Sequence, residues 1–212
     1  MMKILKNLFN NKNNQQENAI TNEIKISNSI NSMYESLEYP IITIKIGNDI
    51  AQKSFVVVYT IEKVRKSINE STGFILPPVR CIETNELQEN EVIFLINNTE
   101  RIQKFLIPNE ENIEKEIYSS IEKLFINNIN DIFRNEIVEE YIARANCRNT
   151  RLIADITFAL STVEIRNILA FLLSNGKSIK NISLIFEKIA ECLFINKTQD
   201  YKMISLLLLD KV

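Results

Sequence analysis

The side chains that most often carry out catalysis are scarce or scattered in this chain. Its 212 residues contain no histidine, which removes the commonest general base and a frequent metal ligand. The three glycines, Gly47, Gly73 and Gly176, are isolated, so no glycine-rich loop is present to bind phosphate groups. No serine or cysteine stands in the sequence context of a nucleophile elbow. The sequence therefore predicts no catalytic residues, no cofactor and no metal site.

Carboxylates are the remaining candidates for acid–base chemistry. Those that cluster have spacings that suit solvent-exposed helix faces rather than a converging catalytic pair: Glu110, Glu111, Glu114, Glu116, Glu139 and Glu140. A second charged set allows either a local basic patch or, more simply, salt bridges between helices: Arg144, Arg148, Arg151 and Arg166. We therefore expect that the protein is not an enzyme and that it recognises other proteins through its surface.

The composition is that of an ordinary globular protein. Hydrophobic residues make up 45% of the chain and charged residues 25%, with a formal net charge of −2. Without an excess of positive charge, a nucleic-acid partner is not expected. No apolar run reaches the roughly 18 residues that would span a bilayer, so no membrane span is predicted. Cys81, Cys147 and Cys192 have neither disulfide nor zinc-site spacing, and we interpret them as buried, reduced thiols of a cytosolic protein.

Residues 1–36 are expected to be a flexible, asparagine-rich segment. Asn, Gln, Ser and Lys dominate it, and such a composition buries too little apolar surface to offset the entropy lost on ordering. The first nine residues combine lysines with apolar side chains. They indicate either a short amphipathic contact with a membrane or partner or, more simply, a frayed terminus. No small-residue cleavage site follows, so we do not expect a signal peptide.

Residues 37–102 are expected to form a small α/β lobe. Isoleucines alternate with polar residues over 42–46, which predicts a half-buried strand. The residues at the start of the range 55–69 are β-branched and would suit a strand. Apolar spacings of three and four then continue through the range, which favours a helix ending near Gly73.

A pair of prolines opens the second half of this lobe. Pro77 and Pro78 exclude a helix and favour an extended chain. Strands are then expected at 79–82 and 91–96, joined by turn-forming residues. The predicted order of elements is therefore β-α-β-β.

Residues 103–195 are expected to form a bundle of about five helices, so that the chain is α+β in class. Apolar residues recur at helical spacing over successive ranges: 109–127, 129–145, 148–160, 162–174 and 178–193. The short C-terminal element, 196–212, contains an apolar run at 201–209. This run is too short for its periodicity to distinguish a strand from a helix.

The most strongly patterned part of the bundle is residues 161–191. Ser161 and Glu164 have the spacing of a capping box, which predicts that a helix begins there. Asn175 and Gly176 are typical of its end, and Ser178 is placed to cap a second helix. Because each helix must cover one apolar face and the other helix is nearest, we expect the two to pack antiparallel.

Two blocks of residues carry a resemblance to a known family. In the first, a glycine leads through a proline pair into a strand, and an Asn-Glu pair precedes the next strand: Gly73, Pro77, Pro78, Arg80, Glu83, Asn90 and Glu91. In the second, a leucine-rich helix runs through a short turn into a helix that ends in an alanine-acid pair: Leu169, Leu172, Leu173, Ser178 and Glu187. Together they resemble the C-terminal cytoplasmic region of the FlhA/InvA export-gate family of flagellar and virulence type III secretion systems. The resemblance implies that these residues are structural or contact a partner.

The resemblance covers residues 41–208 and includes a gap. The family inserts a small α/β subdomain between the strand ending near Asn97 and the helix starting near Asn112, where this chain has too few residues for one. The hairpin carries Glu83 and Thr84 where the family usually has an Asp-Asn pair. The family's membrane half is absent and its final subdomain stops early. We therefore expect a shortened relative.

In this family the cytoplasmic region lies below the membrane export channel, assembles into a ring and receives export substrates and their chaperones. The resemblance implies a non-catalytic docking or assembly role in protein export, in the cytoplasm or at the periphery of a membrane export apparatus. The implied partners are export-gate components, export substrates or chaperones, and further copies of the chain. Because the family builds its chaperone cleft partly from the missing subdomain, ordinary chaperone docking is not expected. The alternative is a cytoplasmic adaptor or regulatory domain unrelated to secretion.

Overall fold

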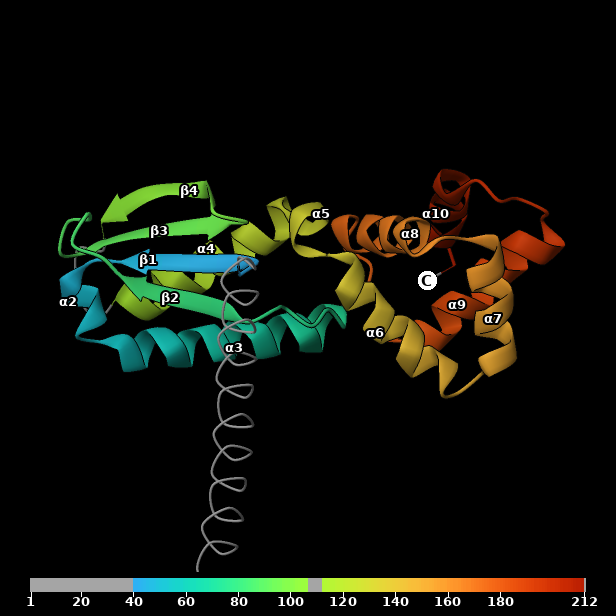
Figure 1. Ribbon diagram of the computed structural model, residues 1–212, viewed down its shortest axis with the longest axis horizontal. Helices are drawn as coiled ribbons and strands as arrows, with labels where there is room; N and C mark the ends of the chain where they lie inside the picture. The colour runs from blue at the N-terminus through green and yellow to red at the C-terminus, as the bar shows by residue number, and fades with distance from the viewer. Residues whose placement is uncertain (1–39, 107–111, 212) are drawn as a thin grey trace, which may run out of the picture. The chain divides into compact units, whose positions relative to one another are not determined.

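The computed structural model describes residues 40–106 and 112–211 (Figure 1). The predicted flexible segment 1–36 and the predicted helix start at Asn109 lie outside these residues. From residue 40 onward the chain forms a single unit, an α+β fold as predicted. The boundaries expected at 102/103 and 195/196 stay predictions.

The sheet has four strands, side by side in the order β2-β1-β3-β4 (Figure 1). They are β1 (Ile42–Ile46), β2 (Val79–Glu83), β3 (Glu91–Ile96) and β4 (Thr99–Leu106). β1 pairs parallel with β2 and antiparallel with β3, and β3 pairs antiparallel with β4. The predicted β-α-β-β order is confirmed.

Strand β4 was not predicted. It is joined to β3 by Asn97 and Asn98, which have φ angles of 50° and 60°. Two residues of positive φ between antiparallel strands make the tight turn whose twist suits a hairpin, and asparagine tolerates this conformation better than most residues do. An Asn-Asn pair after a strand was therefore a usable signal for β4.

The helix between β1 and β2 follows the predicted pattern. After a short helix α2 (Asn48–Ala51), α3 runs over Ser54–Thr72 and buries the apolar side chains spaced three and four apart: Val57, Ile61, Val64 and Ile68. It ends at Gly73, whose φ of 78° lies in the left-handed region that glycine adopts without strain. The predicted stop at Gly73 is confirmed.

The described helices that follow the sheet are more numerous than the expected five. They are α4 (Ile113–Asn127), α5 (Ile129–Ile132), α6 (Asn135–Asn146), α7 (Thr150–Ala159), α8 (Thr162–Ser174), α9 (Ile182–Ala190), the π-helix η2 (Glu191–Ile195) and α10 (Tyr201–Leu209). The helix predicted over 129–145 is broken because Phe133 leaves the helical conformation at ψ 82°. The run at 201–209 is a helix.

The capping box is confirmed, but the predicted antiparallel pairing of its helix is wrong. Ser161 accepts from the Glu164 backbone N–H and Glu164 from the Ser161 N–H, and α8 begins at Thr162. However, α8 packs chiefly against α10 and α6, whereas α9 packs chiefly against α7. The residues between α8 and α9 do not form a single tight turn, since they extend to the end of α3.

Two hydrogen bonds hold this link against the lobe. The Ile179 N–H and the Ser178 hydroxyl both donate to the Thr72 carbonyl, at 2.7 and 3.1 Å. Ser178 is therefore not the cap of the second helix. Asn181 takes that role, since its side chain accepts from the Leu184 N–H at 3.3 Å.

Candidate functional site

An extended segment, Gly73–Pro78, joins α3 to β2 and lies against α6. The hydroxyl of Tyr141, a buried residue of α6, fixes its first half. This hydroxyl donates to the Gly73 carbonyl at 2.8 Å and accepts from the Ile75 N–H at 3.0 Å. Burial raises the pKa of Tyr141, although the Ile75 N–H and the charge of Arg144 act the other way. The hydroxyl therefore keeps its proton at neutral pH and can make both bonds.

An aromatic cluster holds the same segment from its buried side. Phe74 is fully buried and stacks on Phe125 of α4, with ring centroids 5.1 Å apart. It also meets the edge of Phe133, between α5 and α6, at 5.0 Å, and Phe133 meets Tyr141 at 6.1 Å. Offset and edge-to-face pairs of this kind add to the free energy of apolar burial. The segment is thus tied both to α4 and to α6.

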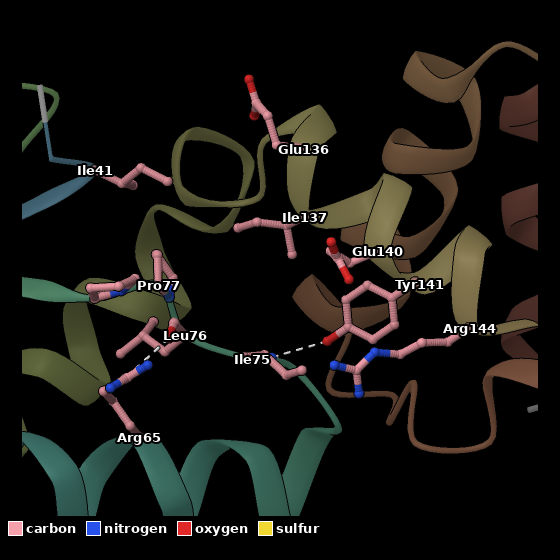
Figure 2. Close-up of a pocket in the computed structure, with 11 residues that line it drawn as sticks. Ile41, Arg65, Ile75, Leu76, Pro77, Glu136, Ile137, Glu140, Tyr141 and Arg144 are labelled. Carbon is pink, nitrogen blue, oxygen red and sulfur yellow. Dashed lines mark hydrogen bonds between the residues drawn. The ribbon is translucent and has the colours of Figure 1, made fainter. Parts of the chain in front are cut away.

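A groove of about 480 Å³ opens between the segment and α6, and we call it the α6 groove (Figure 2). Its lining is mostly apolar and comes from the residue just before β1, from α3, from the segment and from α6: Ile41, Arg65, Ile75, Leu76, Pro77, Pro78, Glu136, Ile137, Glu140, Tyr141 and Arg144. Arg65 reaches from α3 and donates to the Leu76 carbonyl at 3.1 Å, as Figure 2 shows.

A second hollow, of about 520 Å³, adjoins this groove and shares Ile75, Tyr141 and Arg144 with it. We call it the basic pocket. Its other lining residues come from the end of α3, the end of α6 and the link before α9: Asn69, Gly73, Cys147, Arg148, Ile179, Lys180 and Ile182. Cys147 is exposed and Cys81 is half-buried, so of the three thiols predicted to be buried only Cys192 is.

Apart from half-buried Arg65, the charged side chains of these two hollows belong to residues at their exposed edges. The carboxylates of the α6 groove, Glu136 and Glu140, belong to exposed residues. Across the described ranges, 40–106 and 112–211, no group of three or more acidic or cysteine side chains is placed to hold a metal ion. An apolar floor with charged residues at its edge is typical of a surface that receives another chain.

The structure brings only part of the predicted site together. Gly73, Pro77 and Pro78 line the two hollows, and Ser178 lies beside them through its bond to Thr72. The remaining predicted positions are distributed over the fold: exposed Arg80 and Glu83 on β2, Asn90 and buried Glu91 at the start of β3, buried Leu169, Leu172 and Leu173 in α8, and exposed Glu187 on α9. A partner-binding role for these residues stays a prediction.

The sequence analysis missed the hydroxyl of Tyr141 as the residue that fixes the segment. Tyr141 continues the apolar stripe of α6, and nothing in that stripe distinguishes a hydroxyl that bonds from one that does not. The salt bridges expected for the arginines are also wrong. Arg148 donates to the Ser183 hydroxyl at 3.4 Å, Arg166 bonds Asn167, and none of the set forms an ion pair with another described residue.

We expect Tyr141→Phe to lower the free energy of unfolding by about 1–3 kcal/mol. The change keeps the ring but removes two partly buried hydrogen bonds, to the Gly73 carbonyl and from the Ile75 N–H, each worth about 0.5–1.5 kcal/mol. Urea denaturation measures it. Tyr59→Phe is the matched control, because Tyr59 is 53% exposed and its hydroxyl forms no hydrogen bond with another described residue; the free energy of unfolding should change by less than about 0.5 kcal/mol. Equal effects would contradict the role given to Tyr141.

The fold and this groove define a class of protein: an α+β domain with a small sheet lobe, a proline-paired segment and a helical region against it. Neither a protein-family model nor a curated protein matches the chain. Solved structures do match. Chlamydia pneumoniae CdsV is similar at TM-score 0.68 and 14% identity, over 79% of this chain and 70% of that one. CdsV solved in complex with CdsO is similar at TM-score 0.67 and 15% identity, over 79% of this chain and 62% of that one.

Two relatives from other bacteria have the same fold. Shigella flexneri MxiA is similar at TM-score 0.60 and 20% identity, over 79% of this chain and 61% of that one. The nonameric SctV-C of EPEC is similar at TM-score 0.65 and 16% identity, over 79% of this chain and 63% of that one. The chain thus spans less than two thirds of most of these chains. It has the fold of the FlhA/InvA type III secretion export-gate proteins, as the resemblance implied.

None of the described helices is by itself both long and apolar enough to cross a bilayer. The pair Thr150–Ala159 and Thr162–Ser174, bent by 101° between its members, has sufficient length and apolar composition only when the two are taken together.

Proposed function

We propose that this protein is a non-catalytic docking or assembly module of a type III secretion or flagellar export apparatus. The observation that carries the proposal is the likeness of its fold to export-gate structures, at TM-scores of 0.60 to 0.68 over 79% of the chain. The proposed location is the cytoplasm, at the periphery of the membrane apparatus. The α6 groove supports the proposal because it offers an apolar surface where the resemblance placed its proline pair.

The proposed partners are other proteins of the apparatus. CdsV has been solved in complex with CdsO, and SctV-C is nonameric. By analogy, we propose that this chain either joins a ring of export-gate domains or contacts a soluble component beneath it. In the place of the family's inserted subdomain, the described residues contain β4, which extends the sheet instead of building the second wall of a cleft. A role in assembly therefore fits the fold better than ordinary chaperone docking.

Size-exclusion chromatography with light scattering tests the ring role. The full chain is run alone and then mixed with the cytoplasmic region of an export-gate protein from the same cell, at tens of micromolar. We expect self-association or a mixed complex. If both proteins elute as separate monomers, the assembly role is wrong.

A second candidate is an adaptor or regulatory domain that uses the same fold outside secretion. The observation that favours it is the low identity of the structural matches, 14–20%, at which a shared fold does not imply a shared function. Affinity capture of native complexes from the source cell separates the two. Export components in the captured complex support the first candidate, and their absence from an otherwise specific complex supports the second.

A further inference from the structure

The basic pocket is positively charged, although the chain as a whole is slightly negative. The chain carries a formal net charge of −2, yet three cationic residues line this one hollow: Arg144, Arg148 and Lys180. All three are exposed. None of the described residues that line the pocket is acidic, and none of the described residues forms an ion pair with these three. Glu140, one turn before Arg144 on α6, lines the adjoining α6 groove, so the three cations stay in excess over nearby acidic groups, and such an excess attracts anions.

The positions of these residues come from two segments that are far apart in sequence. Arg144 lies in the last turn of α6, and Arg148 follows in the turn just after the helix ends at Asn146. Lys180 comes from the link before α9, which the Thr72 carbonyl holds against the lobe. Cations at a helix C-terminus also compensate the helix dipole. That explains the two arginines, but it does not explain Lys180, which lies outside α6.

The floor of the basic pocket is aliphatic. Ile75, Ile179 and Ile182 line it beside Tyr141, and Ile75 remains 41% exposed. A phosphate site would ordinarily use a glycine backbone or a helix N-terminus. Gly73 does not offer a phosphate site. A carbon added to Gly73 would lie 2.5 Å from the backbone nitrogen of Lys180, so there is no space beside the glycine for a phosphate group. The apolar floor and the cationic edge together suit a peptide that carries both apolar and acidic side chains.

We propose that the basic pocket binds an acidic peptide segment of a protein partner, with an apolar side chain over Ile75 and Ile182 and flanking carboxylates on Arg144, Arg148 and Lys180. Arginine suits this role because its planar guanidinium can bond a carboxylate through two N–H groups. The inference rests on the docking part of the proposed function and names the chemistry of the docked segment. It does not depend on the partner's belonging to a secretion apparatus.

Fluorescence anisotropy with the full chain tests this inference. The probe is a fluorescein-labelled peptide, Glu-Asp-Leu-Phe-Asp-Glu, compared with Gln-Asn-Leu-Phe-Asn-Gln and Lys-Lys-Leu-Phe-Lys-Lys. We expect the acidic peptide to bind with a dissociation constant on the order of 100 µM and to weaken with added salt. We expect the neutral peptide to bind at least about fivefold more weakly. Equal binding of the three peptides, or no binding of the acidic one at 1 mM, would overturn the inference.

Variants then place the binding in the pocket. The double variant Arg144→Gln with Arg148→Gln should weaken the acidic peptide about tenfold, since each lost charge pair at a partly exposed site contributes modestly. As a control for loss of positive charge away from the pocket, Arg80→Gln removes one charge from an exposed position on β2 and should leave affinity unchanged. Equal losses in both would show non-specific attraction and refute the site. Tripolyphosphate is the competing probe: displacement of the peptide at far lower concentration than unlabelled peptide requires would assign the pocket to phosphate instead.

Cys147 supplies an independent readout, because it lines the pocket and is the exposed one of the three cysteines. Saturating acidic peptide should slow its alkylation by iodoacetamide several-fold, read by mass spectrometry. An unchanged rate would mean that the peptide binds elsewhere. If the peptide binds as expected but no export-gate complex forms, the secretion role fails and the pocket assignment stands.

Discussion

Replacing Gly73 by alanine is expected to lower the free energy of unfolding by about 3 kcal/mol or more. Gly73 has a φ of 78°, which costs an alanine roughly 1–2 kcal/mol. The added carbon would also lie 2.5 Å from the Lys180 nitrogen and 2.7 Å from its Cα. These are backbone atoms, so the link before α9 must move, at about 1–3 kcal/mol.

Gly176→Ala is the matched control for this prediction. Gly176 has nearly the same φ, 71°, but no atom lies within 4 Å of the carbon that alanine would add. It should therefore show the conformational strain alone, about 1 kcal/mol. Urea denaturation of both variants measures the difference. If the two variants lose equal stability, the close approach of Lys180 to Gly73 is not a feature of the folded protein.

Phe74→Ala should lower the free energy of unfolding by about 3–5 kcal/mol, the cost typical of deleting a buried phenylalanine. Phe74 is fully buried and loses two ring contacts, to Phe125 and to Phe133, each worth about 0.5–1.5 kcal/mol beyond its buried area. Because these partners belong to α4 and to the α5–α6 junction, the loss weakens the attachment of the lobe to the helices that follow.

Phe158→Ala on α7 serves as the control, since Phe158 is 95% exposed and its removal should change stability by less than about 0.5 kcal/mol. Thermal unfolding followed by circular dichroism reads both variants. If Phe74→Ala retains wild-type stability, the aromatic cluster does not join these elements and the account of the segment is wrong.

The helix ends and strands that were predicted correctly are those that depend on residues close together in the sequence. The stop of α3 depends on Gly73 alone, and the start of α8 depends on Ser161 and Glu164, which are one helical turn apart. Likewise, the strand at 42–46 is present as expected, although Thr43 on its second face is buried. Thr43 lies between Arg80 of β2 and Leu95 of β3 on the same face of the sheet, and no pattern within five residues can predict such cross-strand neighbours.

The misses have the opposite cause. α5 ends at Phe133, whose ring packs against Phe74 and Tyr141. The apolar spacing of residues 129–145 carries no information about these long-range ring contacts. The packing of α8 against α10 could not be deduced either, because an apolar helix face can be covered by any apolar partner that the chain brings near. Proximity along the chain was a poor guide, since the link at 178–181 bonds Thr72 in the lobe.

For the candidate site, the amino-acid sequence by itself determined the Gly73 stop, the extended Pro77–Pro78 entry and the family resemblance, because each depends on residues close together in the chain. Only the tertiary structure decided that Tyr141 would fix this segment and that Arg144, Arg148 and Lys180 would share a pocket. Those residues come from segments tens of positions apart. Their meeting depends on how α6 and the link before α9 pack against the end of α3, which is settled by the sum of many buried contacts across the whole fold.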